Sequence, residues 1–255
     1  MKIIITWICF IGVIVLNALA NILPINGYNT GQISAFYPNA FVPAGFTFSI
    51  WGIIYLMLLL YTIAFTYYTI KQDQYEHAYA FVEQVNVQFI ITCFLNMAWI
   101  LAWHYLKIEL SVLIMLFLLS TLIWIFLKTN PQVKNLNLTQ IFFLQTPFVV
   151  YLGWISVATI ANITALLVAY HWNGMGIQPS YWSAVMIFIA FLLAWYTLYR
   201  YRIIAFSLVV AWAFWGIYKA QGPIHPFLSK LTATGIGFLI AATLFTYFKR
   251  DLKIK

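Results

Sequence analysis

The polar side chains that could bind another molecule are neutral amides, hydroxyls and indoles placed inside apolar runs. In one run they recur every three or four residues. At 100° per residue, this spacing keeps them within about 120° of one helix face. The face is therefore suited to hydrogen bonding and ring stacking rather than to acid–base chemistry. Its residues are Gln84, Gln88, Thr92, Asn96, Trp99 and Trp103.

Two further runs repeat this pattern. Trp51 and Tyr55 are four residues apart in one of them. Trp154, Ala158 and Asn162 follow at intervals of four in the other. Such faces fit hydrogen bonding between packed membrane helices, worth roughly 0.6 to 2 kcal/mol per contact. They also fit an aromatic pocket that holds an apolar planar ligand, and the pattern alone leaves both interpretations open.

Ionisable groups are nearly absent from the apolar runs, which argues against a proton-coupled pump. Glu83 and His104 lie near the ends of one run, and we expect both at the membrane interface. Cys9 and Cys93 each lie inside an apolar run and form no disulfide or metal framework. No HExxH motif, nucleotide loop or Ser-His-Asp set is present. We therefore expect a binding protein rather than an enzyme, with no metal site and no required cofactor.

Membrane helices must position these residues. Of 255 residues, 64% are hydrophobic and only 7% are charged, whereas about a quarter are charged in a typical soluble domain. A spanning helix needs about 20 mostly apolar residues. The sequence therefore predicts an all-α integral membrane protein, in contact with the lipid bilayer. Its eight predicted transmembrane helices are 3–22, 45–70, 81–106, 110–127, 138–170, 181–199, 203–218 and 227–248.

The basic residues give an independent test of eight spans. Lys and Arg collect on the cytoplasmic side of membrane proteins, and here ten fall in alternate segments against three in the others. Both termini are therefore expected in the cytoplasm. The basic residues form no single patch of the kind that nucleic acid requires, so no nucleic-acid partner is expected. The ten are Lys2, Lys71, Lys128, Lys134, Arg200, Arg202, Lys249, Arg250, Lys253 and Lys255, and the three are Lys107, Lys219 and Lys230.

The first apolar run has two interpretations. Lys2, the apolar stretch and Ala18-Leu19-Ala20 resemble a signal peptide with its cleavage site. Asn17 and Asn21 instead fit a polar edge that faces other helices of a bundle. We expect a retained helix, although cleavage would leave seven spans with the same sidedness.

The segment 23–44 is long and has no charged residue. We expect so apolar a loop to pack over the mouth of the helix bundle as a lid. Its predicted lid residues, together with one at the start of the next run, are Phe36, Tyr37, Phe41, Pro43 and Phe46.

Other residues have simpler expected roles. Trp and Tyr at the ends of runs, such as Trp172 and Trp182, are expected to anchor the protein at the membrane interface. Small residues allow close helix contacts within a chain, or between chains in a homodimer. The candidates for such contacts are Ala190, Ala194, Gly235 and Gly237.

Three stretches resemble motifs of the tryptophan-rich sensory protein family (TspO/MBR), which includes the bacterial sensor and the mitochondrial translocator protein, or peripheral benzodiazepine receptor. PAGFTFSIWGIIY at 43–55 resembles the family's Pro-Pro-Gly-Trp start and Val-Trp-x-x-Leu-Tyr core. LNMAW at 95–99 resembles Leu-Asn-x-x-Trp. Pro147 followed by WISVATIAN at 154–162 resembles a proline followed by Trp-x-x-x-Ala-x-x-x-Asn. The likeness covers residues 1 to about 170, and the departures are Phe46, Ser49, Thr92, the distance of Pro147 from Trp154, and a loop without Trp.

The resemblance implies a five-helix translocator-like bundle in residues 1–170. Residues 171–255 would add three helices without a counterpart in the five-helix members. The implied function is a membrane receptor or carrier for a porphyrin, haem-like tetrapyrrole or sterol, in the inner membrane of a bacterium or in an organelle membrane. Porphyrin degradation is the weaker implication because it is linked to a lid Trp that this loop lacks. A transporter or permease subunit that uses the added helices is the alternative.

The resemblance also implies which residues line the pocket. Matching positions are Trp51, Asn96, Trp154, Ala158 and Asn162, with the two Asn side chains as hydrogen-bonding groups. Tyr55 and Trp99, from the same helix faces, complete the predicted site.

Overall fold

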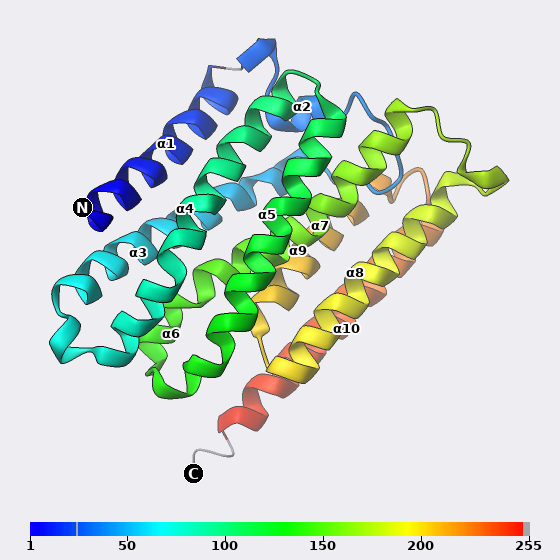
Figure 1. Cartoon of the computed structure of the whole chain (residues 1–255). Helices are drawn as coiled ribbons and strands as arrows, with labels where there is room; N and C mark the ends of the chain where they lie inside the picture. Colours follow the sequence, from blue (N-terminus) through cyan, green and yellow to red (C-terminus); the bar gives the residue numbers. More distant parts are fainter. Residues whose placement is uncertain (24, 252–255) are drawn as a thin grey trace. The chain divides into compact units, whose positions relative to one another are not determined.

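The computed structural model describes residues 1–23 and 25–251. These residues are almost entirely helical and contain no strand (Figure 1). The model has eight helices long and apolar enough to cross a membrane, so the predicted class and number of spans are confirmed. Lys253 and Lys255, counted above among the basic residues, lie outside the described residues. The spans are Lys2–Ile22, Gly45–Ile70, Glu76–His104, Ile108–Asn135, Thr146–Ala169, Pro179–Tyr201, Ile204–Gln221 and Pro226–Lys249.

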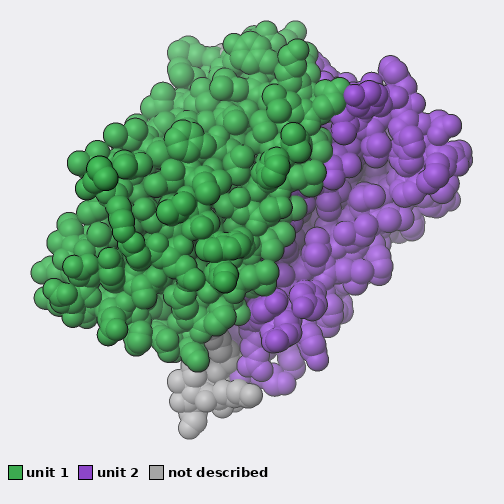
Figure 2. Space-filling model, viewed as in Figure 1, with its two compact units in different colours: residues 1–33, 49–152 green, residues 34–48, 153–255 purple. Residues whose placement is uncertain are grey.

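The chain folds as two compact units, coloured separately in Figure 2. Unit 1 comprises Met1–Ile33 and Ser49–Leu152, and unit 2 comprises Ser34–Phe48 and Gly153–Lys255. The last of the three boundaries along the chain falls inside α7 (Thr146–Ala169). The functional division expected after residue 170 stays a prediction.

Unit 1 contains the first, third and fourth spans, the second span from Ser49 onward, and the start of the fifth. Its elements are α1 (Lys2–Ile22), most of α2 (Thr30–Ser34), α3 (Ile50–Ile70), α4 (Glu76–His104), α5 (Ile108–Thr129) and α6 (Leu138–Leu144). α1 packs on α3 and α4, and α4 packs on α5. In the interior, the Tyr61 ring lies 4.6 Å from Phe148 and 5.0 Å from Phe89. Phe94 and Phe117 are exposed, as expected where helices face lipid rather than water.

The fifth span differs from its prediction as one long helix over 138–170. It is interrupted at Gln145, which separates α6 from α7. Pro147 has no N–H to donate, so the helical hydrogen bond back to Phe143 cannot form. The hydroxyl of Thr146 instead donates to the Ile141 carbonyl at 3.2 Å. Proline lacks the donor that a helix interior needs, but the first turn of a helix does not use that donor. The helix therefore breaks just before Pro147, and a new helix begins there.

Unit 2 contains the rest of α7 and the last three spans. The later helices are α8 (Pro179–Tyr201), α9 (Ile204–Gln221) and α10 (Pro226–Asp251). Each of these three packs on the other two, and α8 and α10 lie side by side in Figure 1. A 3-10 turn, Gly174–Gly176, precedes α8, and another, Gly45–Ser49, leads from Ser34–Phe48 into α3.

Small residues mark the close contacts of these helices. Ala190 and Ala194 are buried, and a Cβ added at Gly235 would lie 3.0 Å from the ring of Phe214. Gly237 has open space around it. Ala190, Ala194 and Gly235 therefore serve close packing within the chain, whereas a contact of Gly237 between chains stays a prediction.

Candidate functional site

A column of aromatic rings lies between α3 and α4 in unit 1. Trp51 stacks on Tyr55 with ring centroids 5.5 Å apart and an interplanar angle of 19°. Trp99 stacks on Trp103 at 5.9 Å and 18°. Trp51 meets Trp99 across the two helices at 5.9 Å and 31°. Because residues four apart share a helix face, the two helices together form one aromatic column of these four rings.

A buried amide network adjoins this aromatic column. Asn96, one turn before Trp99, is only 1% exposed. Its Oδ1 accepts from the amide of Asn17 at 2.8 Å, and its Nδ2 donates to the hydroxyl of Tyr151 at 3.0 Å. The ring of Tyr151 in turn contacts Trp51 edge-on at 6.0 Å. Partners on α1 and α7 therefore fix the amide beside the stacked rings.

The hydroxyl of Tyr55 lies beside this network but does not share its hydrogen bonds. It is buried and interacts electrostatically with Tyr151 and Asn96, but it makes no hydrogen bond of normal geometry within the described residues. A buried hydroxyl usually finds a partner. Tyr55 can therefore supply a hydrogen bond to a molecule bound at the column.

The sequence pattern missed Tyr151 as a site residue. The available signal was a tyrosine within an apolar run, because a membrane-buried hydroxyl needs a partner.

The prediction for the first span is half right. Asn17 is buried and faces the bundle, whereas Asn21 is exposed and donates only to the Asn17 carbonyl of its own helix. Asn21 lies at the last turn of α1, one residue before the helix ends.

One end of the aromatic column is fastened to the first loop. The indole of Trp103 donates to the Thr30 carbonyl at 3.2 Å. His104 is fully buried, with Nε2 3.2 Å from the Thr30 hydroxyl and Nδ1 3.2 Å from the Ile25 carbonyl. Asn26 donates to the His104 carbonyl at 3.0 Å. The loop therefore folds back over the end of α4 and buries His104, while the interfacial depth expected for this residue stays a prediction.

The other predicted residues lie in unit 2. Trp154 and Asn162 are each 3% exposed, and Ala158 lies between them on α7. The Trp154 ring meets Phe48 edge-on at 6.1 Å. A Cβ added at Gly153 would come within 3.2 Å of Val209 on α9, so α7 and α9 approach closely there. Unit 1 thus brings together Trp51, Tyr55, Asn96 and Trp99, unit 2 carries Trp154, Ala158 and Asn162, and ligand contact by any of the seven stays a prediction.

The loop segment Ser34–Phe48 is fastened to α9. The Ala44 N–H donates to the Gly216 carbonyl at 3.0 Å. The indole of Trp212 donates to the Thr47 carbonyl at 3.0 Å. These contacts join the entrance of the second span to the seventh span, a pairing that the sequence pattern did not indicate.

The predicted lid residues differ in their surroundings. Phe46 packs edge-on against Trp212 at 5.5 Å. Phe41 is 1% exposed, whereas Phe36 is 44% exposed. Tyr37 accepts a hydrogen bond at its carbonyl from Asn39, which shapes the turn. The apolar loop is therefore ordered and partly buried, as its composition indicated, while its covering role stays a prediction.

Unit 2 also contains a cavity of about 400 Å³ near the end of α7 and the start of α8. Trp172 and Trp182 line it with their rings 5.2 Å apart, and the Trp182 indole donates to the Gly174 carbonyl at 2.9 Å. The sequence assigned both tryptophans to the interface belt and missed this cavity, because a Trp at a span end suits either place. Its polar lining comes from Asn39, Thr164, Asn173 and Ser183.

The aromatic column offers ring faces and neutral polar groups, and ligand binding there stays a prediction. Its ring faces and neutral hydrogen-bonding groups match a flat, largely apolar molecule. Within the described residues, no group of three His, Cys, Asp or Glu side chains could hold a metal. Cys9 and Cys93 are buried free thiols.

The model of one family, described as TSPO-like protein, matches residues 3–245. No curated protein and no solved structure matches the chain. The family match includes the last three spans, which the motif resemblance had left outside. Because the match covers nearly the whole chain, this multi-pass membrane protein belongs to the TSPO-like family.

Proposed function

We propose that the protein is a membrane receptor or carrier that binds a hydrophobic planar ligand without a covalent reaction. The observation that carries this proposal is the aromatic column beside the buried amide of Asn96. Stacking on an aromatic ring contributes about 0.5 to 1.5 kcal/mol per pair beyond the area buried. A porphyrin, haem-like tetrapyrrole or sterol has the flat shape and apolar surface that such a site favours.

The polar groups explain how a ligand could be oriented. The Tyr55 hydroxyl is buried without a hydrogen bond of normal geometry in the described residues, and the Asn96 amide is held rigidly by two neighbours. Ligand pockets commonly combine aromatic walls with a few fixed polar atoms. A pyrrole nitrogen, a carbonyl or a sterol hydroxyl near Tyr55 would gain the missing hydrogen bond.

A binding titration tests the proposal. Protoporphyrin IX is added to the full chain in lipid nanodiscs, and its absorbance shift gives the dissociation constant. Trp99→Leu should weaken binding about tenfold, because it removes a ring from the column. Trp124→Leu is the matched control because Trp124 is a partly exposed indole on α5.

The same preparation separates the candidate ligands and the alternative function. Saturable binding of a radiolabelled sterol, without binding of protoporphyrin IX, would assign the site to sterols. Equal affinity in folded Trp99→Leu and Trp124→Leu proteins would refute the column as the binding site. Flux across proteoliposomes without saturable binding would instead indicate a transporter.

A further inference from the structure

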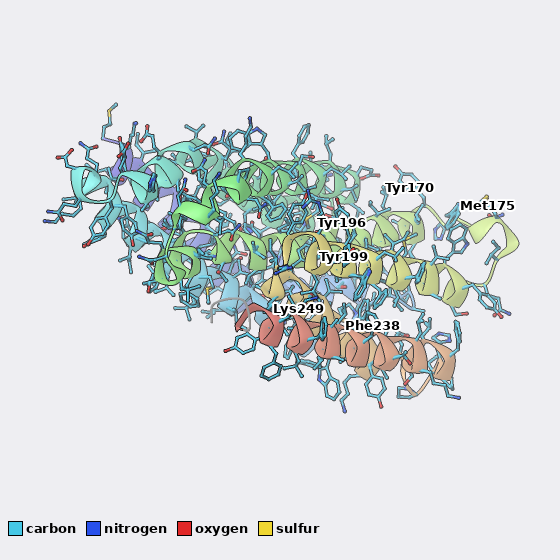
Figure 3. The ribbon with its side chains drawn as sticks, turned by 90° about the horizontal axis from the view of Figure 1, so that it is seen from below. Tyr170, Met175, Tyr196, Tyr199, Phe238 and Lys249 are labelled. Atoms are coloured by element: carbon cyan, nitrogen blue, oxygen red, sulfur yellow. The ribbon has the colours of Figure 1, made fainter. Side chains whose placement is uncertain are left out.

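A second binding feature lies in unit 2, in a groove between α8 and α10. Its volume is about 480 Å³. Figure 3 shows Tyr199 on α8 and Phe238 and Lys249 on α10, three of the residues that line it. The groove belongs to unit 2 alone, so it is separate from the aromatic column of unit 1.

The walls of this groove are apolar and aromatic. Trp195 stacks on Tyr199 with centroids 6.2 Å apart and contacts Phe238 at 4.9 Å. Farther along α10, Phe245 lines the groove and is 67% exposed. Exposed aromatic rings on two membrane-spanning helices face lipid, so the groove is open to molecules of the bilayer.

Two cations lie at one end of the groove. Arg202 follows the last residue of α8, and Lys249 lies two residues before the end of α10. The ammonium group of Lys249 lies 5.5 Å above the Phe245 ring, a cation–π contact that holds it at the groove wall. Both cations lie in the segments that the charge pattern assigns to the cytoplasmic side.

No carboxylate whose position the structure describes neutralises this pair of cations. Neither Arg202 nor Lys249 takes part in an ion pair with another residue whose side chain the structure describes. In the sequence, unit 2 contains a single acidic residue, Asp251. Arg202 also adopts a left-handed backbone conformation with φ of 56°. That conformation favours glycine, so Arg202 occupies it at a conformational cost.

We propose that the groove is a specific site for an anionic phospholipid of the surrounding bilayer. The phosphate lies between Arg202 and Lys249, and one acyl chain lies along Trp195, Phe238 and Phe245. Basic pockets between membrane helices on the cytoplasmic side suit anionic lipid headgroups. The apolar groove also accommodates an acyl chain, which a soluble anion lacks.

Native mass spectrometry of the full chain in detergent tests this site. The probes are palmitoyl-oleoyl phosphatidylglycerol and phosphatidylcholine with the same chains. One phosphatidylglycerol should be retained in preference to phosphatidylcholine. The double variant Arg202→Gln, Lys249→Gln should bind it roughly 30-fold more weakly, because each cation near the membrane contributes roughly a fivefold factor.

The matched control is Lys128→Gln, Lys134→Gln, which removes the same charge from exposed residues of unit 1 on the same predicted side. It should leave binding unchanged. Ala242→Phe fills the groove, keeps both cations and should also weaken binding. Protoporphyrin titration of the same variants reports whether unit 1 remains intact, so a failure of this proposal is distinguishable from a failure of the proposed function.

Three results would overturn the proposal. The first is equal phosphatidylglycerol binding by the double variant and its control. The second is equal competition by soluble glycerol 3-phosphate, which would show that the apolar groove takes no part. The third is that Ala242→Phe leaves lipid binding unchanged and converts a dimer into monomers, which would assign the groove to a second copy of the chain.

Discussion

The amide of Asn17 donates to Oδ1 of Asn96 across 2.8 Å in the interior of unit 1. This bond joins the first span to the third. Inside a membrane bundle, an interhelical hydrogen bond contributes roughly 0.6 to 2 kcal/mol, because lipid offers the separated groups no partner.

Asn17→Ala is therefore expected to lower the free energy of unfolding by about 1 kcal/mol. Asn21→Ala on the same helix should have a much smaller effect, because Asn21 is exposed and bonds only within α1. Unfolding in mixed micelles with increasing denaturing detergent measures both. A double-mutant cycle with Asn96→Ala isolates the pair, and a coupling energy near zero would contradict the role of this bond.

Gly216→Ala is expected to loosen Ser34–Phe48 from α9. The added Cβ would lie 2.9 Å from Cβ and Cγ2 of Thr47, closer than carbon atoms approach. Overpacking of this kind costs about 2 kcal/mol, so the loop should become easier to cleave with protease. Gly237→Ala, which meets nothing within 4 Å, should leave cleavage unchanged. Thr47→Ala in the Gly216→Ala background should restore part of the protection, and no such rescue would indicate another cause.

The first span is expected to remain in the mature protein. The Thr6 hydroxyl donates to Asn86 at 2.7 Å, and the Trp7 indole donates to Thr66 at 2.9 Å. These contacts tie α1 to the rest of unit 1 and support a retained helix. Amino-terminal sequencing of protein purified from membranes should read from Met1 or Lys2. A chain that starts after Ala20 would support the signal-peptide interpretation.

The charge pattern predicts which loops face the cytoplasm. Lys107→Cys should react with a membrane-impermeant maleimide in intact cells, whereas Lys134→Cys should react only after permeabilisation. Both positions are exposed, and the native Cys9 and Cys93 are buried, so background labelling should be low. The reverse pattern of labelling would invert the proposed orientation.

The spans could be predicted because lipid imposes a strong rule, that each crossing needs one long apolar run. The four-residue spacing of Trp51 and Tyr55, and of Trp99 and Trp103, likewise indicated two aromatic faces. The break at Gln145 was foreseeable from Pro147, which lacks a donor. It was missed because the apolar run continues through it without a change in composition.

Partners distant in the sequence could not be predicted. The apolar composition of the first loop indicates burial, but it does not indicate that Thr47 contacts Trp212. Trp172 and Trp182 have the residue type of interface anchors, and only the fold places them around a cavity. Asn17 and Asn21 differ only in position on α1, and the end of the helix decides which of them is buried.

The contact of Trp212 with Thr47 spans 165 residues of sequence. Because a chain leaves the ribosome from its amino terminus, Thr47 enters the membrane long before α9 exists. The entrance of the second span therefore gains this hydrogen bond only after the seventh span has been synthesised. A chain released after its fifth span would lack α9 and with it the hydrogen-bond partner of Thr47.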